Sequence, residues 1–173
     1  MDSLRGKLLI AAPSLFDFFR RTVILMVEHT EEGAFGVVLN RASETTVGEA
    51  VPALAEITGA DEPVWIGGPV GAESVVVLGE FDDPEESPKL VVGEVGVVDP
   101  ELGAGLGRVR VFAGHSGWEA GQLEEEIERD AWVIEPAVAE DVFAADDVWS
   151  MTLQRRGGEY ALLATMPEDP SLN

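Results

Sequence analysis

The stretch VFAGHSGWEAGQLEEEIERDAW, residues Val111–Trp132, carries the strongest structural signal in the chain. Its pattern predicts a strand, a tight glycine turn and then a helix. Ser116 followed by Glu119 fits a capping box, in which the hydroxyl accepts one free N–H of the helix end and the glutamate reaches back to another. We expect Trp118 and Trp132 to anchor the core and the glutamates of this helix to form a solvated face.

Length and composition indicate one globular domain. The chain has 173 residues, of which 46% are hydrophobic, and this suits a single domain spanning 1–173 with its core from about 6 to 166. There are no cysteines, so disulfides and thiolate metal sites are excluded. The apolar run Leu8–Ala12 is too short for a signal peptide or a membrane span, and we expect a cytoplasmic protein.

The charge of the chain is strongly negative. The formal net charge is -22, from 33 acidic and 11 basic residues. A field of this sign repels nucleic acid and anionic membrane surfaces, so we expect neither as a direct partner. Two explanations of the acidity stay open. One is adaptation to genomic base composition or high intracellular salt, and the other is binding of metal cations or of a basic partner.

Apolar runs separated by short loops predict a sheet built mainly from hairpins. The β-branched run Thr22–His29 and its partner Phe35–Asn40 form the clearest hairpin. Thr46 and Glu49 repeat the capping-box pattern and open a short helix, which Pro52 bends or shortens. Further elements are expected at Lys7–Ala11, Val64–Ile66, Ser74–Phe81, Leu90–Val98, Arg108–Ala113 and Trp132–Ile134 as strands, and at Asp147–Arg155 as a closing helix. Hairpins outnumber strand–helix alternations, which predicts an α+β fold with a mainly antiparallel sheet.

The glycine-rich Gly114–Trp118 segment invites comparison with the nucleophile elbow of hydrolases. Trp118 stands where that motif has its last glycine, and no histidine follows the serine as the hydrolase order requires. Ser116 is better explained as a helix cap, although a convergent Ser116–His29 pair stays open.

Three other features have a structural and a chemical interpretation. His29 ends a strand, where a histidine is usually hydrogen-bonded to a neighbouring loop, and the two histidines lack zinc-site spacing. Gly67 and Gly68 either offer backbone N–H groups to an anion or form a simple turn. Arg108 and Arg110 share one strand face by the period of two, and we expect both to pair with nearby carboxylates.

Several motifs occur in a fixed order along the chain: LLIAAPSLFDFFRRTVILMVEH, GAFGVVLNR, GGPV, GHSGWEAGQLEEEI, AW and VW. In this order they resemble the YqgE/AlgH family of bacterial proteins, from about residue 6 to 155. The resemblance implies a single α+β domain whose bifurcated sheet folds into a pseudo-barrel with flanking helices. It implies no established reaction, although some members are labelled transcriptional regulators from a link to alginate control.

The resemblance also points to particular polar positions. By motif position the family's polar residues are Arg21, Glu28, His29, Asn40, Gln122, Glu124 and Glu126. Many members carry tyrosine and alanine where this chain has His115 and Ser116. Neither residue is therefore expected to be catalytic across the family.

These observations favour a non-catalytic cytoplasmic binding or regulatory module without cofactor or metal, whose partner is an unknown protein or small-molecule ligand. Any regulation would be indirect, and the oligomeric state stays open. The candidate cleft comprises Arg21, Glu28, His29, Asn40, Gly67, Gly68, Gly114, His115, Ser116, Trp118, Gln122 and Glu126. The alternative is a metal-assisted hydrolase that uses His29 and the carboxylates Glu124 and Glu126.

Overall fold

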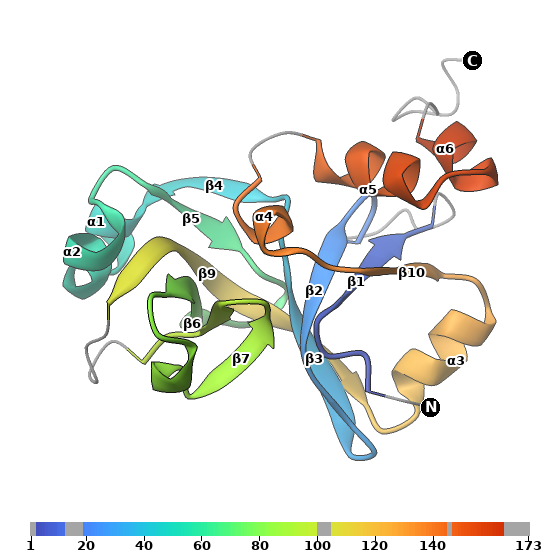
Figure 1. Cartoon of the computed structure of the whole chain (residues 1–173), viewed down its shortest axis with the longest axis horizontal. Helices are drawn as coiled ribbons and strands as arrows, with labels where there is room; N and C mark the ends of the chain where they lie inside the picture. The colour runs from blue at the N-terminus through green and yellow to red at the C-terminus, as the bar shows by residue number, and fades with distance from the viewer. Residues whose placement is uncertain (1–2, 13–18, 100–104, 145–146, 165–173) are drawn as a thin grey trace.

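A computed structural model describes residues 3–12, 19–99, 105–144 and 147–164 of the chain. Ten strands form one mainly antiparallel sheet in this part of the protein (Figure 1). The strands are β1 Lys7–Ala11, β2 Val23–Thr30, β3 Gly33–Val38, β4 Ala42–Thr46, β5 Pro63–Ile66, β6 Val70–Phe81, β7 Lys89–Val92, β8 Val95–Val97, β9 Leu106–Glu119 and β10 Trp132–Pro136. The helical segments are α1 Val47–Ala50, η1 Pro52–Leu54, α2 Ala55–Thr58, η2 Pro84–Glu86, α3 Gln122–Glu128, α4 Ala139–Val142, α5 Val148–Arg156 and α6 Glu159–Leu163.

The β2–β3 hairpin is the centre of the sheet, as the sequence predicts. Alternate residues of β2 enter different cores, with Leu25 in one cluster and Ile24 and Met26 in another. Because both faces are covered, the strand reads as a continuous apolar run. A bulge lies between Met26 and Glu28, where the pairing with β3 shifts. The partner strand ends at Val38, earlier than expected.

The sheet branches along β9, the longest strand. The strand order of the sheet is β10-β1-β2-β3-β9-β6-β8-β7. Along one edge, β9 pairs with β6. The opposite edge is shared, because parallel β5 pairs at Phe112 and Ala113 while antiparallel β3 pairs from Ser116 to Glu119. Gly114 lies between these two pairings with φ +72°. In Figure 1, β9 therefore runs from the half beside α1 and α2 into the half beside α3. The expected bifurcated sheet is confirmed.

The sheet is open but curled. Its end strands β10 and β7 do not pair with each other within the described residues. Nevertheless, β7 approaches the start of β1 so closely that a Cβ atom on Gly6 would lie 2.7 Å from the carbonyl oxygen of Val91. Lys89 of β7 also forms an ion pair with Glu28 of β2. These contacts give the pseudo-barrel that the resemblance implies.

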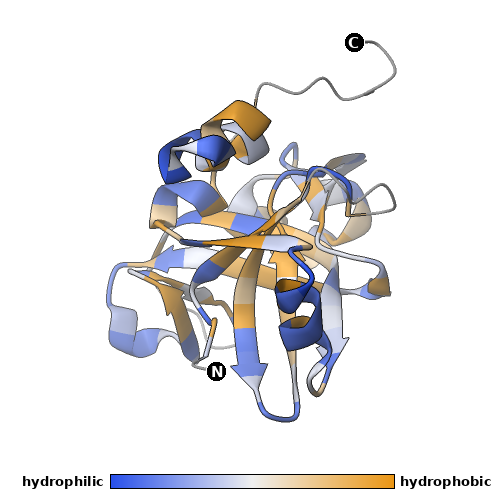
Figure 2. Cartoon of the chain, turned by 90° about the vertical axis from the view of Figure 1, so that its right-hand side faces the viewer, coloured by the Kyte–Doolittle hydropathy of each residue, from blue (hydrophilic) through white to orange (hydrophobic). Residues whose placement is uncertain are grey.

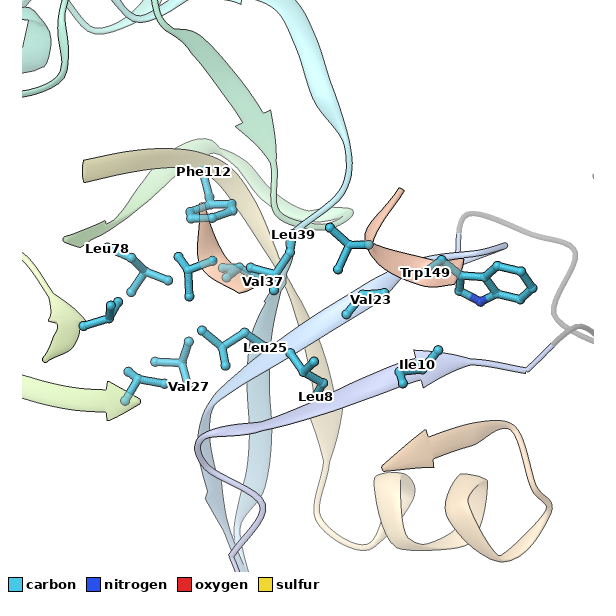
Figure 3. Packing of buried hydrophobic residues seen from close by; sticks show 14 of the residues in the cluster. Leu8, Ile10, Val23, Leu25, Val27, Val37, Leu39, Leu78, Phe112 and Trp149 are labelled. Carbon is cyan, nitrogen blue, oxygen red and sulfur yellow. The ribbon is translucent and has the colours of Figure 1, made fainter. Parts of the chain in front are cut away.

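The interior of the curl is one apolar cluster drawn from both branches. Figure 3 shows Leu8, Leu25 and Val37 from one branch facing Leu78 and Phe112 from the other. Figure 2 shows apolar residues along the strands, whereas the helices around them carry both hydrophilic and apolar residues. None of the described helices is long and apolar enough to cross a membrane.

The capping box expected at Ser116 is wrong. β9 continues through this residue to Glu119, and α3 begins only at Gln122, after Gly121 in a left-handed conformation. Ser116 is fully buried, and its Oγ donates a hydrogen bond of 3.2 Å to the carbonyl oxygen of Gly67. The physical reason is strand pairing with β3, which leaves no helix end here for the hydroxyl to cap.

The second capping prediction is confirmed for the threonine cap but not for the full capping box, because the Glu49 carboxylate accepts from the Thr46 hydroxyl at 3.1 Å instead of from the Thr46 backbone N–H. The Thr46 side chain accepts the backbone N–H of Glu49 at 3.3 Å at the start of α1. Pro52 then begins the short η1 turn, so the helix is broken as expected. Strands β5 and β10 and the closing helix α5 also lie where the sequence places them. The pattern did not predict β4, α4 and α6.

Candidate functional site

The candidate residues from the sequence lie in several places rather than in one cleft. Gly67, Gly68, Gly114 and Ser116 meet where the loop after β5 crosses β9. A Cβ atom on Gly68 would lie 2.1 Å from the backbone carbonyl of His115, and one on Gly114 would lie 2.6 Å from the carbonyl oxygen of Gly68. The glycines therefore allow two backbones to touch at the branch point. The Gly67 N–H donates to Ala113 O at 2.8 Å, so this group is not available to an anion.

Glu126 holds two tryptophans together. Its Oε1 accepts the indole N–H of Trp118 at 3.0 Å and that of Trp132 at 2.9 Å. Its Oε2 accepts from the Gln122 amide at 3.1 Å. The two indole rings meet edge to face with centroids 6.1 Å apart. The tryptophans are core anchors, as predicted, but this glutamate is not part of a solvated face.

Arg21 and Asn40 lie at the opposite end of β2 from His29. The Asn40 amide donates to the carbonyl oxygen of Arg21 at 2.8 Å, and its Oδ1 accepts from Val23 N at 3.1 Å. Arg21 has a φ of +55°, and its guanidinium stacks 4.4 Å from the ring centre of Trp149. Both residues thus fix the turn that leads into β2.

Two further candidates, Glu28 and His115, have contacts on the strands themselves. Glu28 is engaged by Lys89, and the His115 ring lies edge-on to Phe35 at 5.7 Å. Neither points to a ligand by itself.

His29 forms the one described histidine–carboxylate pair. Its side chain is 6% exposed, and its Nδ1 accepts the backbone N–H of Leu4 at 2.9 Å. A backbone N–H can only donate, so Nδ1 carries no proton and Nε2 does. Nε2 then donates to the Glu124 carboxylate at 2.9 Å. The bond to Leu4 agrees with the expected tie between a strand-end histidine and a neighbouring segment.

A polar pocket of about 310 Å³ opens beside this pair, lined by Ser3, His29, Thr30, Glu31 and Glu124. Glu124 is 32% exposed, so its carboxylate is within reach of solvent. Across the described ranges, no group of three or more His, Cys, Asp or Glu side chains is arranged to hold a metal ion. The pocket therefore presents two carboxylates and two hydroxyls around a fixed imidazole.

The sequence identified only part of this pocket. His29 and Glu124 stood out by motif position, whereas Ser3, Thr30 and Glu31 did not. The hairpin turn explains the last two, since they directly follow the strand-end histidine. Ser3 reaches the pocket because Leu4 bonds to a residue 25 positions along the chain, a contact without a local signal.

Arg108 and Arg110 differ in their partners. Arg108 pairs with two carboxylates as expected: its Nε lies 2.8 Å from Glu80 and its Nη1 2.9 Å from Glu140. This guanidinium lowers the pKa of Glu80 to about 2 through hydrogen bonds and charge, and it lowers the pKa of Glu140 in the same way. Arg110 has no carboxylate partner within the described ranges, so the expectation for it is wrong. Its N–H groups donate to backbone carbonyls instead.

The Glu80–Arg108 pair predicts a specific loss of stability in acid. Because the pKa of Glu80 is depressed in the folded state, its ionised form stabilises the fold above about pH 4.5, and that contribution is lost as the pH falls towards 2. The pair is solvent-accessible, so we expect its contribution to stability to be small. Urea unfolding measured across this pH range should show that the free energy of unfolding falls less steeply with decreasing pH for Glu80→Gln than for the wild type. The exposed Glu86→Gln is the control, and equal slopes for both variants would contradict the assignment.

Comparison with known proteins places this geometry in a family. The AlgH-like family matches residues 8–161. A UPF0301 protein of Thermobifida fusca is 41% identical over 190 residues, which covers 99% of this chain and 96% of that protein. The crystal structure of a Corynebacterium diphtheriae protein matches with a TM-score of 0.85 and 33% identity, covering 95% of this chain and 93% of that one. The solution structure of AlgH from Pseudomonas aeruginosa matches with a TM-score of 0.73 and 29% identity over 95% of each chain. The chain therefore belongs to the AlgH-like family, and the resemblance of its ordered motifs is confirmed.

Proposed function

We propose that the protein is a non-catalytic binding module that takes a cationic group into the pocket beside His29. The pocket lining carries the carboxylates of Glu31 and Glu124 and the hydroxyls of Ser3 and Thr30. It includes no lysine or arginine among the described residues. An ammonium or guanidinium group would find charge-assisted acceptors there. The charge of -22 on the whole chain would raise the local concentration of such a group.

The state of His29 is the observation that carries this proposal. Both ring nitrogens are committed, Nδ1 to Leu4 N–H and Nε2–H to Glu124. A general base needs a free lone pair near the proton it removes, and a metal ligand needs a free ring nitrogen. The ring has neither in this arrangement. His29 therefore suits a role in fixing the Glu124 carboxylate for recognition.

A metal-assisted hydrolase has less support in the geometry. Of the carboxylates in that hypothesis, Glu126 is engaged by two indoles and Glu124 by His29. In our proposal the module acts in the cytoplasm on the basic group of a small ligand or a protein. Any effect on transcription would then be indirect.

Titration with simple cations tests the pocket. We expect butylammonium and butylguanidinium to cause saturable amide shifts at residues 29–31 and 124, while neutral butanol causes none at equal ionic strength. Glu124→Gln should weaken binding about tenfold, since it removes one charge-assisted hydrogen bond. Glu128→Gln, on the same helix but outside the pocket, should bind like the wild type. Equal responses to the amine and to butanol would refute a cation site.

A second assay separates binding from catalysis. Purified protein is incubated with generic ester, phosphate and nucleic-acid substrates, with and without Mg²⁺ or Mn²⁺. We expect no turnover above that of His29→Ala. Turnover that depends on His29 would favour the hydrolase instead.

A further inference from the structure

A second pocket of about 280 Å³ lies in the other branch of the sheet, between α2, β9 and the segment after α4. Its lining combines one apolar wall with groups of both charges: Ile57, Thr58, Glu62, Gly107, Arg108, Val109, Arg110 and Phe143. In Figure 1 this region is far from α3, where the His29 pocket lies. The two pockets are therefore separate sites.

Arg110 is held rigidly in this second pocket. Its guanidinium lies 3.8 Å from the ring centre of Trp65. Nη1 donates to Val142 O at 2.9 Å and to Ala144 O at 3.2 Å, and Nη2 donates to Phe143 O at 3.2 Å. All three acceptors are neutral carbonyls, so the positive charge is oriented by the protein but not neutralised by these bonds.

One edge of the Arg110 guanidinium is unused by the protein. A guanidinium has five N–H groups, and the three bonds above leave Nε–H and one Nη2–H with no acceptor in the described part of the chain. Nε–H and the Nη2–H on its side of a guanidinium point in parallel, and this edge binds a carboxylate through two hydrogen bonds. Burial lowers the pKa of Arg110 to about 10, which leaves the group charged at neutral pH.

The other charged groups define which ligand the pocket can take. The Arg108 guanidinium is already hydrogen-bonded to the carboxylates of Glu80 and Glu140, so it is a poor binding group for an incoming anion. Glu62 is exposed, and its carboxylate acts through space on Arg110, opposing the effect of burial on the pKa. No ion pair holds Glu62 within the described ranges. The site thus presents one cation that is hydrogen-bonded only to neutral carbonyls, one carboxylate and the apolar side chains of Ile57 and Val109.

We propose that this pocket binds a small zwitterionic ligand with an apolar side chain, such as an α-amino acid. The ligand carboxylate lies on the free Nε/Nη2 edge of Arg110, and its ammonium group faces Glu62. The apolar part contacts Ile57 and Val109. The His29 pocket has no cationic side chain for the ligand carboxylate among its lining residues, so shifts at Arg110 and Trp65 rather than at residues 29–31 report binding at this second site.

Three matched probes test the assignment: L-leucine, N-acetyl-L-leucine and L-leucinamide, which carry both charges, the carboxylate alone and the ammonium alone. NMR is recorded on protein labelled at the arginine Nε and tryptophan Nε1 positions. We expect saturable shifts at Arg110 and Trp65, with affinity falling from leucine to N-acetyl-leucine to leucinamide. Arg110→Gln should lower the affinity for leucine tenfold or more. Arg110→Lys keeps the charge without the planar edge and should lose a similar factor.

The remaining variants distinguish the roles of the groups. Glu62→Gln should make leucine and N-acetyl-leucine bind equally, because only the ammonium contact is lost. Arg156→Gln, an arginine outside the pocket, should leave all affinities unchanged. The proposal is overturned if leucine causes no saturable shift at Arg110, if Arg110→Lys binds like the wild type, or if Glu62→Gln keeps the preference. A normal thermal unfolding curve shows that each variant is folded.

Discussion

Replacing Gly68 with alanine is expected to destabilise the protein by about 3 kcal/mol or more. The added Cβ would lie 2.1 Å from the carbonyl carbon and oxygen of His115 and 2.4 Å from Ser116 N. All these atoms belong to the backbone of β9, so no side-chain rotation relieves the clash. The loop and the strand must separate at the branch of the sheet. The midpoint of urea unfolding, followed by tryptophan fluorescence, measures the loss.

Gly117→Ala is the matched control for this change. Gly117 lies on β9, the strand that Gly68 contacts, and its added Cβ meets its nearest neighbour, the His115 ring, at an ordinary 3.9 Å. We expect it to be neutral or to stabilise by less than about 1 kcal/mol, since alanine restricts the unfolded chain. If both variants unfolded at the same urea concentration, close backbone contact would not be the reason for the glycine.

Glu126→Ala is expected to cost about 2–4 kcal/mol of unfolding free energy, because a buried N–H without an acceptor costs about 1–3 kcal/mol. The change leaves two such groups, the indole N–H of Trp118 and of Trp132, whose residues are 7% and 5% exposed. The indole resonances should also lose their protection from hydrogen exchange. Equilibrium unfolding and exchange rates measured by NMR give both quantities.

Two variants show whether the acceptor or the charge matters. Glu128→Ala removes an exposed carboxylate from the same helix and should change stability by no more than about 0.5 kcal/mol. Glu126→Gln keeps an oxygen for the indoles and should lose less than half of what alanine loses. Equal losses for Glu126→Ala and Glu128→Ala would show that the indole bonds contribute nothing.

Elements governed by local rules were predictable from the sequence. The β2–β3 hairpin follows from two β-branched apolar runs and a loop of turn residues. The Thr46 cap follows from a local rule, because a serine or threonine side chain before a helix accepts the backbone N–H three residues later. Pro52 breaks the helix because its ring fixes φ and removes the backbone N–H. The motif order also led to the correct family and therefore to the branched sheet.

Elements governed by distant partners were not predictable. Ser116 has a capping pattern, but its hydroxyl bonds to Gly67, which lies 49 residues earlier. Pairing with β3 keeps this segment in strand form, so tertiary contacts override the local signal. Likewise, nothing in the run of glutamates from Glu124 to Glu128 tells which one faces the indoles and which one faces His29. The two pockets depend on such long-range contacts, and for this reason candidate residues were predictable but their arrangement in space was not.

The position of β1 sets a limit on when the chain can finish folding during synthesis. β1 lies between β2 and β10, and the carbonyl of Ala11 accepts the indole N–H of Trp149, 138 residues later. The apolar hairpin therefore leaves the ribosome long before the segments that cover it exist. A chain that is made from its N-terminus must keep this surface from aggregating until the last described helices emerge. Premature termination before Trp132 would thus leave β1 without its partner strand β10, whereas synthesis through α5 supplies Trp149, whose indole N–H bonds to Ala11.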